Sequence, residues 1–83
     1  MRTGNSMVDR AVRRLLSEGF HTVSYNKANP GEKSILLTNS DSHEAAVIKF
    51  GGRQEPQLSR GDIADRKPDV TMPVGTYLLH WRP

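Results

Sequence analysis

The sequence predicts an α+β fold in which one N-terminal helix packs on a small antiparallel sheet, in the order α-β-β-β-long loop-β. Three observations support this class. Residues 7–18 have the hydrophobic spacing of an amphipathic helix, residues 20–50 hold three short strand-like segments separated by polar turns, and residues 74–83 alternate again like a strand. A helix followed by short antiparallel strands is typical of a two-layer α+β domain.

The helix is predicted over residues 7–18. Its apolar side chains fall on one half of the helical wheel, namely Met7, Val8, Ala11, Val12, Leu15 and Leu16. Ser6 is the expected N-cap, and Asp9 stands three residues later, where a carboxylate suits both a capping box and the positive helix end. Gly19 suits the left-handed conformation that ends a helix, and Phe20 is then placed to pack back on the last turn.

The three strands are predicted over residues 20–25, 33–38 and 44–50. The first is rich in aromatic and β-branched residues, the second is a short apolar run, and the third places alternate apolar residues on one face. Between the first two strands, the sequence NPG is strong turn chemistry, and a polar NSDSH turn separates the second from the third. These segments therefore form a meander.

Residues 51–73 are predicted to be a long loop, because they hold three prolines and few apolar anchors. Residues 58–63 are the one part of this segment with the composition of a short strand or turn. A structureless segment of this length is uncommon in a compact domain and tends to be either functional or mobile.

The C-terminal segment, residues 74–83, is predicted to close the sheet as a further strand. Tyr77 and Trp81 fall on one face of that strand, and we expect it to be the core face because aromatic side chains dominate small cores. His80 and Arg82 then fall on the opposite face.

The composition limits the class of protein. With 83 residues the chain is expected to form a single domain over residues 1–83. It has no cysteine, which excludes disulfides, thiolate zinc sites and cysteine nucleophiles. No apolar run reaches the roughly 20 residues that a membrane span needs, and the N-terminus lacks the apolar segment of a secretion signal. A cytoplasmic protein without membrane contact is therefore expected.

The formal net charge is +3, from 12 Lys and Arg against 9 Asp and Glu. Arg10, Arg13 and Arg14 cluster on the polar arc of the predicted helix. Asp9 lies four residues before Arg13, and Glu18 lies four residues after Arg14, so three arginines less two acids leave this helix at +1. Phosphate binding strengthens with the number of available cations. The arginines therefore form either a solvated helix face or a surface for nucleic acid or an acidic protein.

Metal binding and catalysis receive little support. The three histidines, His21, His43 and His80, lie far apart in the sequence, and none has a paired metal-ligand spacing. No metal ion, cofactor or catalytic residue is therefore predicted. A metal-independent nuclease or toxin that uses His43, His80 and Arg82 stays as an alternative on chemical grounds, since a histidine supports acid–base catalysis. No set of motifs in the chain identifies a known family.

These features favour a small non-catalytic binding protein, an adaptor or inhibitor that docks on a partner protein, such as an accessory factor of a phage or mobile element. The long loop and the sheet edges are the expected docking elements, and an edge also offers a route to homo-oligomers. The first alternative is a small basic nucleic-acid-binding module. The residues expected to contact either kind of partner are Arg10, Arg13, Arg14, Lys49, Arg53, Arg60, His80 and Arg82.

Overall fold

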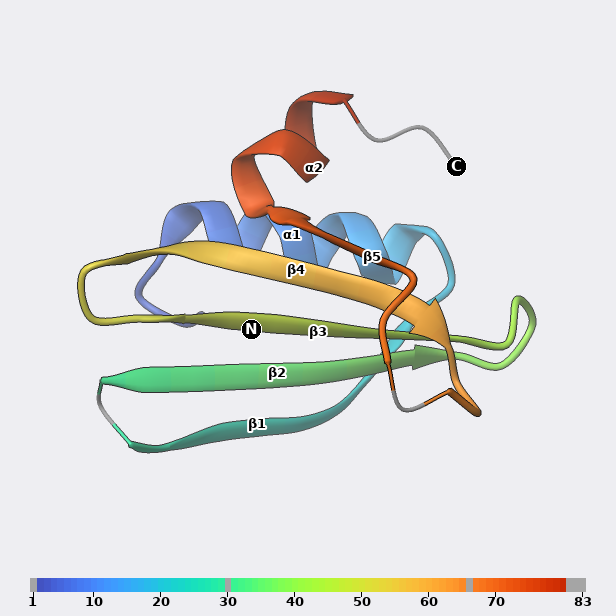
Figure 1. Cartoon of the computed structure of the whole chain (residues 1–83). Coiled ribbons are helices and arrows are strands. Elements are labelled where there is room, and N and C mark those ends of the chain that lie inside the picture. Colours follow the sequence, from blue (N-terminus) through green and yellow to red (C-terminus); the bar gives the residue numbers. More distant parts are fainter. Residues whose placement is uncertain (1, 30, 66, 81–83) are drawn as a thin grey trace.

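The computed structural model describes residues 2–29, 31–65 and 67–80, apart from the side chains of residues 28 and 29. Five strands form one antiparallel sheet in the order β1-β2-β3-β4-β5. One helix, α1, lies against one face of the sheet, and a second, α2, packs beside it at the β5 edge (Figure 1). The elements along the chain are α1 (Ser6–Ser17), β1 (His21–Asn29), β2 (Glu32–Asn39), β3 (Glu44–Gly51), β4 (Gln54–Asp62), β5 (Val70–Pro73) and α2 (Val74–His80).

The predicted α+β class is confirmed by this arrangement, with an N-terminal helix on an antiparallel sheet. The bounds of α1 lie within one residue of the predicted ones at each end. The second helix, α2, is a short segment of seven residues that was not expected. Within the described ranges, no helix is long and apolar enough to span a membrane.

The N-terminus of α1 differs from the prediction in its capping residues. Asn5, not Ser6, is the N-cap, and its side-chain oxygen accepts hydrogen bonds from two backbone amides of the first turn at 3.0 and 3.2 Å. Asp9 does not complete a capping box, because its carboxylate accepts hydrogen bonds from the hydroxyl and the amide of Thr3, both at 2.8 Å. These two bonds, the hydroxyl's first, lower the pKa of Asp9.

The C-terminus of α1 ends as predicted. Gly19 has a φ of +105°, and its amide donates to the carbonyl of Leu16 at 3.1 Å. The amide of Phe20 donates to the carbonyl of Leu15 at 3.0 Å, which completes the Schellman pattern. Both Leu15 and Phe20 are buried in the core. After this turn, β1 begins at His21, two residues after Gly19.

One face of the sheet supplies the core. Ile35, Ile48 and Leu58 are cross-strand neighbours on β2, β3 and β4, and all three are fully buried. The apolar stripe of α1 packs against this face, and α2 adds Val74 and Tyr77. Side chains of a strand alternate between the two faces, so every second residue points away from this core. We refer to the opposite face of the sheet, which neither helix covers, as the open face.

The prediction of a long loop over residues 51–73 is wrong for most of this segment, although the short strand or turn expected at residues 58–63 overlaps β4. Residues 54–62 form β4, which pairs with β3 along most of its length and with the short β5 on its other side. The pairing with β5 reaches only to Gln57, so at Pro56 the strand has one neighbour and the missing N–H is tolerated. In β4, Arg60 stands at a position whose side chain points to the core side, where an apolar residue is expected. The sequence of β4 therefore does not show the apolar–polar alternation of a strand.

The predicted terminal strand is also wrong, because Val74–His80 form the helix α2. Val74 and Tyr77 are both fully buried, although an odd spacing would place them on opposite faces of a strand. Leu79, which a strand would place beside Tyr77, is 74% exposed. Helical geometry explains both facts, since residues three apart share a face of a helix. Trp81, expected in the core, lies outside the described residues.

Candidate functional site

The open face is a continuous surface across the strands, and its side chains are mostly small or hydroxylated. At its centre, Leu36 of β2 and Val47 of β3 are cross-strand neighbours. Both are half-buried, although neither α1 nor α2 lies over them. On the three middle strands the open face consists of Ser34, Leu36, Thr38, Ala45, Val47, Lys49, Gln57, Ser59 and Gly61.

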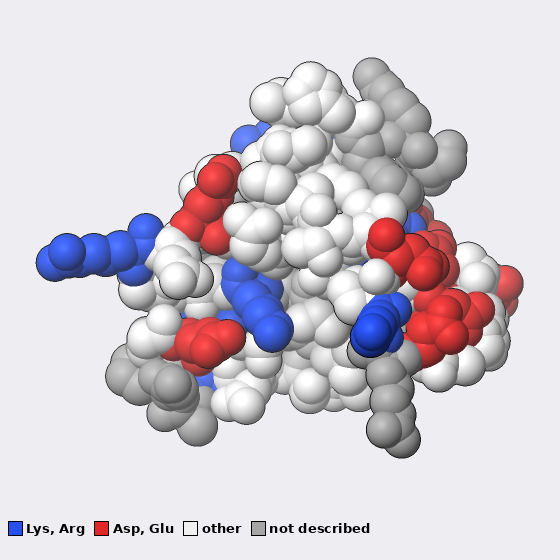
Figure 2. Space-filling view, in the orientation of Figure 1, with Lys and Arg blue, Asp and Glu red and all other residues white. Residues whose placement is uncertain are grey.

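The centre of the open face carries little charge. Figure 2 views this face and shows mainly uncharged side chains over its middle, with acidic side chains on both its left and its right sides. The described residues of this face include no Phe, Tyr or Trp. Tyr25 and Phe50 belong to the core side, where their ring centroids lie 6.1 Å apart. The open face therefore combines an apolar centre with a border rich in hydroxyl groups.

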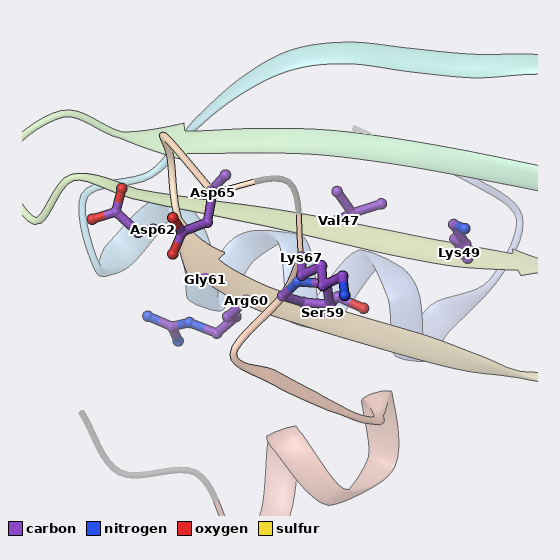
Figure 3. Close-up of a pocket in the computed structure, with 10 residues that line it drawn as sticks. Val47, Lys49, Ser59, Arg60, Gly61, Asp62, Asp65 and Lys67 are labelled. Atoms are coloured by element: carbon purple, nitrogen blue, oxygen red, sulfur yellow. The ribbon is translucent and has the colours of Figure 1, made fainter.

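The β4–β5 connection, which the structure describes at residues 63–65 and 67–69, folds over one end of the open face. The amide of Asp69 donates to the carbonyl of Arg60 at 2.9 Å and holds the connection against β4. Between the connection and the sheet lies a hollow of about 270 Å³, which is floored by Ala45 and Val47 (Figure 3). Typical small-molecule pockets span about 300–1,000 Å³, so this hollow suits a partner's side chain better than a cofactor.

The charged side chains of this hollow are separated along its length. Asp62 and Asp65 lie toward one end, Lys49 lies toward the other, and Lys67 lies between them (Figure 3). Asp62 is engaged within the fold, since it accepts a hydrogen bond from the backbone amide two residues later at 2.8 Å and contacts His43 Nδ1 at 3.2 Å. These contacts, the amide's first, lower the pKa of Asp62.

Gly61 allows the connection to approach β4 closely. A Cβ at this position would lie 3.0 Å from the backbone nitrogen of Asp69 and 3.2 Å from Cα of Pro68. We therefore expect Gly61→Ala to displace the connection and to lower the free energy of unfolding by about 1–3 kcal/mol, as overpacking does. Urea unfolding measures the loss, and hydrogen exchange at the Asp69 amide reports the displacement.

The control for this prediction is Thr38→Ala, a change on the same face but away from the connection. It should alter the free energy of unfolding by less than about 0.5 kcal/mol. Unchanged stability and unchanged amide exchange in Gly61→Ala would contradict the close packing of the connection on β4.

A second cluster of charged side chains lies on the core side of the sheet, around Arg60, which is only 5% exposed. The guanidinium of Arg60 contacts Glu18 at 3.2 Å and Glu44 at 3.1 Å, and it lies 5.0 Å from the centre of the Phe20 ring. The hydroxyl of Tyr77 donates a hydrogen bond to the Glu18 carboxylate. The cluster therefore links the end of α1, two strands and α2.

The tyrosine of this cluster gives stability a dependence on alkaline pH. Burial first, and then the hydrogen bond to Glu18, raise the pKa of Tyr77 above its ordinary value of 10.0. The folded protein therefore holds the phenolic proton more tightly than the unfolded chain does. This contribution is fully present below about pH 10 and is lost as the pH rises toward the folded-state pKa.

We expect the urea midpoint of unfolding to fall above about pH 10 in the wild type and to fall less in Tyr77→Phe, which has no proton to lose. Tyr25→Phe is the matched control, because it removes the other described tyrosine and should keep the wild-type decline. The same decline in all three proteins would contradict the assignment to Tyr77.

Arg14 belongs to the contact between the two helices. Its guanidinium donates hydrogen bonds to the backbone carbonyls of Tyr77 and Leu78 at 3.2 and 2.9 Å, and it lies 4.9 Å from the centre of the Tyr77 ring. The carboxylate of Glu18, which was expected to neutralise Arg14, is bound to Arg60 and Tyr77. Arg14 thus has a structural role at the α1–α2 contact.

The remaining cations of the predicted surface are divided between opposite sides of the molecule. Arg10 and Arg13 are exposed on α1, which covers the core side of the sheet. Lys49 is exposed on the open face, because its cross-strand neighbours Ser34 and Gln57 belong to that face. One flat partner surface therefore cannot contact Arg10 and Arg13 on α1 and Lys49 on the open face at the same time.

The other predicted contact residues are dispersed. Arg53 lies in the turn between β3 and β4 and shares a surface hollow with Lys49, so the structure does bring these two cations together. His80 is exposed at the end of α2. Arg60 is held in the cluster described above, and Arg82 lies outside the described residues.

The histidines are also separated. His21 is the first residue of β1, and His43 lies in the β2–β3 turn with a φ of +59°. His80 is the last residue of α2. Over the described ranges, no three His, Cys, Asp or Glu side chains gather as metal ligands.

Neither Leu36 nor Val47 is among the residues predicted to bind a partner. The sequence does contain a signal for them, since both are apolar residues at strand positions that alternate with the core positions. A sheet covered on one face usually carries polar residues at such positions. Finding this signal requires the strand register, which shows that the two residues are neighbours on the uncovered side.

Comparison of the chain with models of protein families finds no match. Comparisons with curated proteins and with solved structures find none either. The functional proposal therefore rests on the open face, the hollow at its end and the charged cluster around Arg60.

Proposed function

We propose that this chain is a non-catalytic protein-docking module, an adaptor or inhibitor that binds a partner protein through its open face. The observation that carries the proposal is the pair of Leu36 and Val47, two neighbouring apolar side chains that neither helix covers. Specific protein interfaces have an apolar core within a polar, solvent-accessible rim. Ser34, Thr38 and Ser59 adjoin the pair on the same face and supply such a rim.

Nucleic-acid binding, the main alternative, receives less support from the placement of the cations. Affinity for a phosphate backbone requires several cations on one surface, whereas Arg10 and Arg13 lie on the other side of the sheet from Lys49. Single-stranded nucleic acid also binds through aromatic platforms, and the described part of the open face has no Phe, Tyr or Trp. This alternative requires binding that falls steeply with salt concentration.

We assign the cluster around Arg60 to stability rather than to catalysis. Its Arg, Glu and Tyr side chains contact one another and join α1 to α2, so they are already engaged in the folded chain. The nuclease alternative, which uses His43 and His80, gains no support from their positions, because one lies in the β2–β3 turn and the other ends α2.

The variant Val47→Glu tests the proposal. A carboxylate at the centre of the open face is expected to weaken partner capture by about tenfold or more, because an unpaired charge is costly to bury in an interface. The variant and the wild type are immobilised at equal density, and the proteins that each captures from cell extract are identified by mass spectrometry. Circular dichroism should show an unchanged fold, since Val47 is only half-buried.

The matched control is Arg13→Glu, which introduces the same side chain on the exposed side of α1. It should capture the same proteins as the wild type does. Equal capture by Val47→Glu and the wild type would contradict docking through the open face. Capture that is lost only in Arg13→Glu would move the binding surface to α1.

A further inference from the structure

The two ends of the open face differ in charge. At the end near the β3–β4 turn, a hollow is lined by equal numbers of acidic and basic side chains, namely Glu32, Glu55, Lys49 and Arg53. At the opposite end, β2 and β4 end, β3 begins and the β4–β5 connection leaves the sheet. The described residues of this second end include four exposed acids, namely Asp41, Asp62, Asp65 and Asp69. We refer to it as the acidic end.

Most carboxylates of the acidic end are available to a partner. Within the described ranges, no ion pair engages the exposed side chains of Asp41, Asp65 and Asp69. The side chain of Asp62 is 46% exposed beside its histidine partner. Lys67 is the one described cation of the β4–β5 connection, and its side chain extends away from Asp62 and Asp65 in Figure 3. The described part of the acidic end is therefore negative, although the whole chain carries +3.

We infer that the open face binds a basic segment of a partner protein, with an apolar part of that segment on Leu36 and Val47 and its Lys or Arg side chains at the acidic end. This inference rests on the proposed function, since it names the partner class of the same surface. Charged groups across protein interfaces are arranged so that their potentials are complementary. The apolar centre thus supplies the core of the contact, and the acidic end selects the sign of the partner's charge.

The hollow under the β4–β5 connection fits the side chain of a lysine or an arginine. Its floor of Ala45 and Val47 is apolar, and its volume is about 270 Å³. Lys and Arg bury an apolar stem along such a surface while the charged head stays in contact with water. Asp65 lines the same hollow, so a stem on this floor can place its charged head beside a carboxylate.

The spacing along β3 lets one segment use both the apolar centre and the hollow. Ala45 lies two residues from Val47, which corresponds to about 7 Å at 3.4 Å per residue. An extended partner segment covers this distance with about two of its own residues. A short run that changes from apolar to basic residues therefore matches the open face from its centre to the acidic end.

The placement of charge disfavours other modes of binding. The acidic end repels the phosphates of a nucleic acid, which bind to cations. On the opposite side of the molecule, α1 presents the exposed Arg10 and Arg13. These arginines repel a basic segment, so such a partner is directed to the open face rather than to the helix side.

Fluorescence anisotropy of the whole chain with labelled synthetic peptides tests this inference. The first peptide joins an apolar block of leucine and valine to a block of lysines. The second has glutamates in place of the lysines, and the third has serines in place of the apolar block. We expect the first peptide to bind about tenfold or more tightly than either of the others, and its addition to shift the amide NMR signals of Ala45 and Val47.

Charge reversal locates the binding of the first peptide. Asp65→Lys/Asp69→Lys should weaken it by about tenfold or more, because lysines then meet lysines. Glu32→Lys/Glu55→Lys is the matched control, since it changes the net charge equally at the balanced end and should weaken binding by less than about threefold. Both double variants should keep the circular dichroism spectrum of the wild type, because all four side chains are exposed. Equal weakening by the two would mean that binding follows net charge, and it would overturn the inference.

Other results separate this inference from the proposed function. If the glutamate peptide binds more tightly and shifts the Val47 amide, the basic partner is wrong and the open face remains a docking surface. The same shift caused by a single-stranded oligonucleotide, or by self-association at higher protein concentration, would also overturn the basic partner. If no peptide binds, this inference is wrong, and the capture experiment with Val47→Glu decides the proposed function alone.

Discussion

Arg60→Met should lower the free energy of unfolding by about 3 kcal/mol, because removing one partner of a buried ion pair leaves the other charges uncompensated. The side chains of Glu18 and Glu44, which both contact the Arg60 guanidinium, are only 13% and 31% exposed. Methionine keeps much of the volume that packs on the Phe20 ring. The fall in the free energy of unfolding should therefore come mainly from the missing charge and less from a new cavity.

Urea unfolding measures this effect, and Arg53→Met is the matched control. It removes an exposed arginine from the β3–β4 turn and should change stability by less than about 0.5 kcal/mol. Adding Glu18→Gln and Glu44→Gln to Arg60→Met should recover part of the loss, since neutral side chains need no cation. A loss below about 1 kcal/mol for Arg60→Met would mean that these ion pairs behave as solvated surface pairs.

Tyr77→Ala should lower the free energy of unfolding by about 3–5 kcal/mol, as the loss of a large buried aromatic side chain does. Tyr77 is fully buried, its ring lies against the Arg14 guanidinium, and its hydroxyl donates to Glu18. Because α2 has only seven residues, it depends on such contacts to be stable. Tyr77→Phe keeps the ring and should lose about 1.5–3 kcal/mol, the usual contribution of a hydrogen bond to a charged acceptor.

Hydrogen exchange shows whether this loss arises at α2. In Tyr77→Ala the amides of α2 should exchange faster than those of β3, because the helix can detach before the sheet unfolds. Leu79→Ala, on the same helix but 74% exposed, should leave both stability and exchange nearly unchanged. Full protection of α2 in Tyr77→Ala would contradict its role as the anchor of this helix.

The first half of the fold was predictable because its signals are local. Gly19 and the apolar stripe before it define α1 within a few residues of chain, and the observed Schellman hydrogen bonds follow from them. The polar turns likewise separate β1, β2 and β3 correctly. β1 is longer than predicted, since its pairing with β2 continues to Asn29 opposite Glu32, although three of its last four residues are polar.

The second half was not predictable from local signals. Arg60 occupies a core-facing position of β4 only because Glu18 and Glu44 are there to receive it, and Glu18 lies 42 residues away in the sequence. The segment of α2 has only seven residues, too few for the spacing of its apolar side chains to distinguish a strand, with a period of two, from a helix, with a period of 3.6. The packing of Tyr77 in the core favours the helix.

The same long-range contacts explain why the predicted binding residues did not form one surface. Spacing along a helix suggested that Glu18 neutralises Arg14, but the fold presents Glu18 to Arg60 and turns Arg14 toward α2. The open face is equally non-local, because Leu36 and Val47 become neighbours only when β2 pairs with β3 in the observed register. Charge alone therefore does not identify the open face.

Photo-crosslinking tests most directly whether the open face docks on a protein. A photoreactive phenylalanine analogue replaces Thr38 on the open face in one variant and Arg13 on α1 in another. We expect the variant at position 38 to form a covalent protein adduct, of twice the chain mass if the partner is a second copy, and the variant at position 13 to form none. Protein adducts at position 13 alone, or adducts with nucleic acid alone, would contradict the open face as a protein-docking surface.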